Sequence, residues 1–68
     1  MTIEQVKAII KGEIAKYECS RDKWEEKAKG LVRGSPEQAI ARGVMEAYQN
    51  KALGLKDLLS IINETEAR

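Results

Sequence analysis

The sequence predicts an all-α protein with one long helix over about residues 3–29, followed by a helical hairpin over about 36–50 and 55–64, which assembles as a homodimer. Apolar residues recur every three or four positions in the first thirty residues, which is helical periodicity. A run rich in glycine, serine and proline then separates this segment from two shorter apolar ones. The chain has 68 residues, one cysteine and no histidine, so no internal disulfide or ordinary zinc site supports its small core.

The first helix is the best defined element. Thr2 can cap its start while Gln5 reaches back, and Gly30 is expected to end it in the left-handed conformation. The spacing between its apolar residues alternates between three and four, except for two consecutive steps of four and a gap at Arg21. The aliphatic part of Arg21 can cover the apolar face of the helix, or its guanidinium can specify a partner. These positions are Ile3, Val6, Ile10, Ile14, Tyr17, Trp24, Ala28 and Leu31.

Residues 30–34 form the expected hinge of a single helical domain over residues 1–68. The run has neither the glycine spacing nor the following Lys-Ser or Lys-Thr of a phosphate-binding loop. Ser35 can cap the start of a helix whose first residue is Pro36. Gln38 stands three residues after Ser35, at the position of its capping-box partner. A second helix should therefore begin at residue 36.

The remaining segments predict two short helices. Asn50 can end the second helix, Leu53 can fill a corner, and Gly54 can begin the third. Ile61 lies to one side of the inner stripe of this third helix, so that helix is apolar on more of its circumference than one neighbour covers. The inner stripe consists of Leu55, Leu58, Leu59 and Ile62.

The lengths of these helices predict self-association. A first helix of about 28 residues is roughly 42 Å long, whereas a second helix of about 15 covers only roughly 22 Å of it. A second copy of the chain is the economical cover for the rest, and charges of opposite sign on the two flanks of the first helix favour a parallel pair without excluding an antiparallel one. The residues expected to carry self-association or partner binding are Ile10, Tyr17, Arg21, Trp24, Leu31 and Ile61.

Composition argues against several functions. The net charge is +1, there is no histidine, and the carboxylates lie among lysines, so neither catalytic nor metal-ligating residues nor a cofactor site are expected. Neither a basic apolar leader nor a run of roughly 20 apolar residues is present, and no helix pairs a bulky apolar face with a dominant basic one. We therefore expect a cytoplasmic protein without membrane binding.

The function that these observations favour is protein binding by a small, regulatory, self-associating helical protein, acting as an inhibitor, adaptor or assembly factor for a larger protein. Phages and other mobile elements often encode such small neutral chains, although no residue here identifies that origin. The alternative is a nucleic-acid-binding regulator in which residues 36–64 form a helix-turn-helix. Its phosphate contacts would come from Lys16, Lys23, Lys27, Arg33 and Lys56.

Overall fold

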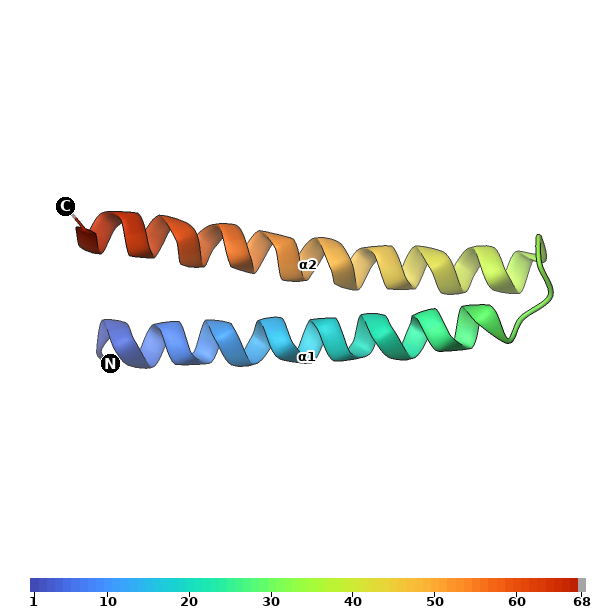
Figure 1. Ribbon diagram of the computed structural model, residues 1–68, viewed down its shortest axis with the longest axis horizontal. Helices are drawn as coiled ribbons and strands as arrows, with labels where there is room; N and C mark the ends of the chain where they lie inside the picture. Colours follow the sequence, from blue (N-terminus) through green and yellow to red (C-terminus); the bar gives the residue numbers. More distant parts are fainter. Residues whose placement is uncertain (68) are drawn as a thin grey trace.

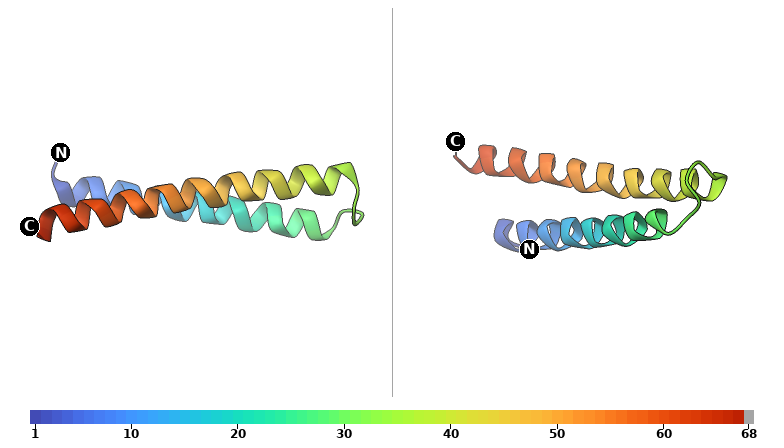
Figure 2. Two further views of the ribbon diagram at one scale, coloured as in Figure 1. Left: turned by 90° about the horizontal axis from the view of Figure 1, so that it is seen from above. Right: turned by 45° about the vertical axis from the view of Figure 1, so that its right-hand side comes forward.

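The computed structural model describes residues 1–67, and these form two long antiparallel helices joined by a short connection (Figure 1). Helix α1 covers Ile3–Lys29 and helix α2 covers Pro36–Ala67. No strand occurs in this part of the chain, so the predicted all-α class is confirmed. The two helices cross at a shallow angle in a rod measuring 50 × 17 × 13 Å (Figure 2).

Helix α1 confirms the prediction of one long N-terminal helix. The Thr2 hydroxyl accepts a hydrogen bond from the Gln5 N–H at 3.1 Å, and the Gln5 side chain accepts one from the Thr2 N–H at 2.8 Å. This capping box satisfies two N–H groups that have no partner within the helix. The helix passes Gly12 without interruption, because a single glycine costs only about 1 kcal/mol relative to alanine.

The connection between the helices differs in one detail from its prediction. Gly30 ends α1 in the right-handed region, at φ −82° and ψ −7°, so the predicted left-handed cap at this residue is wrong. Gly34 has the positive φ of 78° instead, and it reverses the chain one residue before Ser35. The Ser35 hydroxyl then accepts from the Gln38 N–H at 3.2 Å, as expected for a helix that starts at Pro36.

The prediction of a helical hairpin over 36–50 and 55–64 is wrong, because α2 is one continuous helix of 32 residues. Gly54 lies within it, and Leu53 is exposed on its surface rather than filling a corner. A glycine within a helix, such as Gly54, costs about 1 kcal/mol relative to alanine. The packing of Leu55, Leu59 and Ile62 against α1 contributes more stabilising free energy than this cost. The helix also passes the predicted end at residue 64 and reaches Ala67.

The length of α2 removes the reason for a second copy to cover α1. At 1.5 Å per residue, a helix of 32 residues is about 48 Å long, so α2 follows α1 over its whole length. The N-terminus and the end of α2 therefore lie together at one end of the rod (Figure 1). The apolar spine of α1 is turned towards α2 of the same chain.

The seam between the helices follows a seven-residue repeat on both sides, as in a coiled coil. Lys7 and Arg21 occupy seam positions on α1, so the irregular step and the gap in the apolar pattern disappear. The α1 seam consists of Lys7, Ile10, Ile14, Tyr17, Arg21, Trp24 and Ala28. The α2 seam consists of Gln38, Ala41, Met45, Tyr48, Ala52, Leu55, Leu59 and Ile62.

We predict that Gly54→Ala raises the free energy of unfolding by about 0.5–1 kcal/mol, because alanine favours a helix interior and a Cβ at Gly54 meets no atom within 4 Å. Urea unfolding followed by circular dichroism measures this change. Gly34→Ala is the control and should lower the free energy by about 1 kcal/mol, since its φ is positive. A loss of stability in Gly54→Ala would contradict the continuous helix.

Candidate protein-interaction surface

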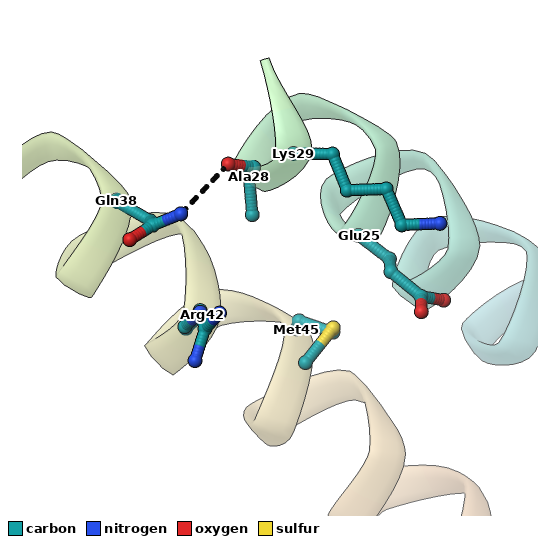
Figure 3. Close-up of a pocket in the computed structure, with 6 residues that line it drawn as sticks. All are labelled: Glu25, Ala28, Lys29, Gln38, Arg42 and Met45. Carbon is teal, nitrogen blue, oxygen red and sulfur yellow. Dashed lines mark hydrogen bonds between the residues drawn. The ribbon is translucent and has the colours of Figure 1, made fainter. Parts of the chain in front are cut away.

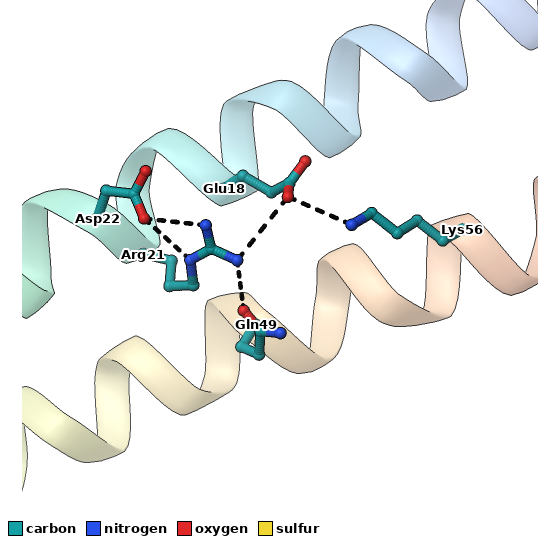
Figure 4. Close-up of polar contacts among 5 residues, drawn as sticks. All are labelled: Glu18, Arg21, Asp22, Gln49 and Lys56. Carbon is teal, nitrogen blue, oxygen red and sulfur yellow. Dashed lines mark hydrogen bonds and ion pairs between the residues drawn. The ribbon is translucent and has the colours of Figure 1, made fainter.

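The two long sides of the hairpin, on either side of the seam, differ in chemistry. On one side, charged and amide groups join α1 to α2 (Figure 4). The other side carries a second apolar row on α2. We refer to them as the polar side and the apolar side.

Arg21 is the centre of the polar side. Its guanidinium donates to the Gln49 Oε1 of α2 at 2.6 Å and to the Asp22 carboxylate at 2.9 and 3.0 Å (Figure 4). Glu18 lies 3.8 Å from the same guanidinium and accepts from Lys56 of α2 at 3.3 Å. These groups link the two helices and satisfy each other, which makes this side a poor surface for a further helix.

A small hollow of about 210 Å³ lies further along the polar side, next to the connection (Figure 3). The Gln38 amide donates to the Ala28 carbonyl at 3.2 Å across the two helices. The hollow contains one carboxylate, from Glu25, and two cations, from Lys29 and Arg42. This set contains no nucleophile with an adjacent base.

The apolar side is formed mainly by α2. A row of apolar and small residues repeats with steps of three and four and is interrupted once, by Lys51. Ile40 is 67% exposed and Ile61 is 58% exposed, although both are large apolar residues. We call this row the α2 stripe, and it consists of Ile40, Val44, Ala47, Gly54, Leu58 and Ile61.

A second hollow, of about 290 Å³, opens on the apolar side where the N-terminus of α1 lies beside the end of α2. Almost all of its exposed lining is apolar, in contrast to the hollow on the polar side. Ile61 belongs both to its wall and to the α2 stripe. The lining residues are Ile3, Val6, Ile61, Ile62, Thr65 and Glu66.

Lys7 and Glu66 form an ion pair that joins the two helices at this end of the hairpin. The hydrogen bond to Glu66 raises the pKa of Lys7 above its ordinary value of 10.5. A raised pKa in the folded state means that the contact supports folding below about pH 10.5 and is lost as the pH rises through the folded-state pKa. At neutral pH the pair therefore holds the end of α2 against α1.

Aromatic side chains and lysines occupy the edge of the seam. The rings of Tyr17 and Tyr48 lie 6.1 Å apart, and the Lys51 ammonium lies 5.5 and 5.7 Å from their centroids. Lys27 lies 4.3 Å from the centroid of the Trp24 ring. Both ammonium groups are in the range of cation–π attraction, which directs their charge onto the hairpin itself.

The structure places most of the residues predicted for self-association inside the hairpin. Ile10 is buried, and Tyr17 and Trp24 are half-buried in the seam against α2. Arg21 contacts Gln49 of the same chain. Leu31 lies partly exposed in the connection. Of the six residues predicted for self-association, Ile61 is the one on the α2 stripe.

The residues predicted for nucleic-acid contact are divided between the two sides of the hairpin and the connection. Residues 36–67 are a single helix, so the corner of a helix-turn-helix is absent from the described chain. Lys16 pairs with Glu13 at 3.6 Å, Lys27 lies over Trp24, and Lys56 pairs with Glu18 on the polar side. Lys23 lies on α1 and Arg33 in the connection, away from Lys56.

Two other kinds of site are absent from residues 1–67. No group of three or more His, Cys, Asp and Glu side chains lies close enough to hold a metal ion in this range. Neither α1 nor α2 contains a stretch long and apolar enough to span a bilayer. The α2 stripe is thus the best candidate for a functional surface.

Comparisons with protein families, with curated proteins and with solved structures found no match to this chain.

Sequence reasoning found Ile61 but missed Ile40 and Leu58 as members of one surface. It did not single out Ile40, and it assigned Leu58 to the inner stripe of a third helix. A signal was present, because the α2 stripe repeats every seven residues from 40 to 61. It becomes visible only when residues 36–67 are treated as one helix.

We predict that Arg21→Ala lowers the free energy of unfolding by about 1 kcal/mol, because it removes the hydrogen bond to Gln49 and the stem that covers the seam. Denaturant unfolding measures this loss. Lys16→Ala is the control, since Lys16 is exposed and pairs with Glu13 of its own helix. Equal stability of the two variants would show that the Arg21 contacts do not hold the helices together.

Proposed function

We propose that this protein is a small, non-enzymatic, regulatory helical protein that binds a second copy of itself and a larger protein partner. An inhibitor, adaptor or assembly factor works in this way, by presenting a surface without reactive groups. The observation that supports the proposal is the α2 stripe, an apolar row interrupted only by Lys51, on the side of the hairpin opposite the Arg21 network. In a helix with only one neighbour, the second apolar row is what a further helix would cover.

The exposed area supports self-association. The chain exposes 5,150 Å², whereas a compact monomer of its mass exposes about 4,300 Å². The excess of about 850 Å² is close to the roughly 800 Å² that each partner buries in a standard protein interface. One docked partner would therefore bring the exposed area to the ordinary value.

The small core also supports self-association. The buried residues are Ile10, Ile14, Ala28, Ala41 and Ala52, so three of the five carry only a methyl group. Chains of this size usually gain stability from a disulfide, a metal or a partner subunit. Cys19 is a free, exposed thiol, and a second copy is the remaining source of stability.

The proposed location is the cytoplasm, where the reducing environment keeps an exposed thiol such as Cys19 unpaired.

We predict that Leu58→Asp raises the dissociation constant of the homodimer at least about thirty-fold, because it places a charge on the α2 stripe. Leu53→Asp is a matched control, since Leu53 is 45% and Leu58 43% exposed and the two lie about 140° apart around α2. Light scattering behind a sizing column, over a hundredfold range of concentration, measures both dissociation constants. Circular dichroism checks that both variants remain helical.

A wild-type chain that stays monomeric over the whole range would contradict the proposed self-association. Equal effects of the two substitutions would place the contact elsewhere than on the α2 stripe.

A further inference from the structure

The apolar side of the hairpin has a near symmetry that points to its occupant. Within the α2 stripe, the positions from Val44 to Ile61 are symmetric about a midpoint between Lys51 and Gly54. The smaller side chains of Val44 and Ala47 lie on one side of this midpoint, and the larger ones of Leu58 and Ile61 lie at the matching positions on the other side. From this arrangement, and on the basis of the proposed self-association, we propose that the α2 stripe docks antiparallel on the same stripe of a second copy.

The complementarity appears when two copies of α2 are laid antiparallel with a two-fold axis at this midpoint. Val44 then lies opposite Ile61 of the second copy, and Ala47 lies opposite its Leu58. Each layer combines a smaller side chain with a larger one, which is how antiparallel helices fill the space between them. The symmetry repeats both layers, so one set of residues forms both halves of the interface.

Lys51 is the charged residue that interrupts the α2 stripe, and the antiparallel arrangement accommodates it. Its ammonium lies over the Tyr17 and Tyr48 rings of its own hairpin, so the charge is directed away from the middle of the stripe. Gly54 of the second copy lies opposite Lys51 and leaves space for its stem, since a Cβ at Gly54 meets no atom within 4 Å in the hairpin. A parallel arrangement would instead bring the two Lys51 side chains together, which is unfavourable.

The hollow at the end of the hairpin fits the same register. Ile40 of the second copy lies opposite Thr65, which lines the hollow together with Val6 and Ile61. Ile40 is the most exposed large apolar residue of α2, and the hollow of about 290 Å³ has room for its side chain. Each copy thus supplies one projecting isoleucine and one hollow, at equal distances from the two-fold axis.

Helix α1 contributes little to this contact. On the apolar side its residues beyond the first three turns are polar or charged, so it offers no continuation of the α2 stripe. These residues are Glu13, Lys16, Ser20, Lys23 and Lys27. The proposed dimer is therefore a four-helix arrangement with the two α2 helices in contact and the lysines of α1 in solvent.

Disulfide exchange between two single-cysteine proteins tests the direction of the pair. Both proteins carry Cys19→Ser, and one adds Ala47→Cys while the other adds Leu58→Cys. They are mixed in equal amounts in a glutathione redox buffer, and mass spectrometry identifies the disulfide-linked species. The antiparallel register predicts that the mixed species exceeds its statistical share of about one half and is at least several-fold more abundant than either homodisulfide, because residues 47 and 58 lie opposite one another.

The outcomes separate this inference from the proposed function. Predominant homodisulfides would indicate a parallel pair and overturn the antiparallel register, while leaving self-association intact. Dimers that form by light scattering but give no disulfide in any combination would overturn the α2 stripe as the contact. A monomer by light scattering would overturn the proposed function itself.

The hollow is tested separately. We expect Ile40→Ala to raise the dissociation constant about tenfold, because it withdraws a side chain from each of two hollows. Val32→Ala is the control, since Val32 is also exposed and β-branched but lies in the connection. An unchanged dissociation constant for Ile40→Ala would overturn the assignment of Ile40 to the hollow.

Discussion

Each helix of this hairpin can bury only the side that it turns to the other, because residues 1–67 contain no third element. The seam residues repeat every seven positions on both helices, so α1 and α2 stay in contact from the connection to the termini. The environment of every other residue is then set by its angle from the seam. A large apolar residue far from the seam, such as Ile40 or Ile61, has to remain exposed in a single chain.

The polar and apolar sides follow from which residues stand next to the seam. On the polar side, Glu18, Arg21, Gln49 and Lys56 satisfy one another across the two helices. On the apolar side, Lys51 and Lys27 lie over aromatic rings of the seam instead of forming ion pairs between the helices. The first arrangement completes a surface, whereas the second leaves the α2 stripe uncovered beside it.

The sequence predicted α1 well because its signals are local and consistent. The capping box at Thr2 and Gln5 and the apolar periodicity act within one or two turns. The break predicted between residues 50 and 55 failed for the opposite reason. Asn50 and Gly54 are weak local signals, and the burial of more distant α2 residues against α1, which depends on the tertiary fold, outweighs them.

The distinction between local signals and tertiary effects also explains how much of the candidate surface could be predicted. Periodicity shows that the face of α1 containing Tyr17 and Trp24 is covered, but it cannot show whether the cover is α2 or a second copy. The prediction that one neighbour cannot cover the apolar residues around Ile61 used only angles within a helix, and the exposure of Ile61 agrees with it. Ile40 and Leu58 could join that surface only after the continuity of α2 was known.

The small seam and the exposed stripe have a common physical explanation if folding and association are coupled. Ala28, Ala41 and Ala52 let the two helices approach closely, but they bury little apolar area, so the seam alone stabilises a hairpin weakly. A partner that binds only the folded hairpin adds stability by mass action, and it does so without a larger seam. The apolar residues that a self-sufficient hairpin would place in its seam are found instead on the α2 stripe, where a second helix can use them. In the proposed dimer, the chain divides its apolar residues between folding and binding, and α2 takes part in both.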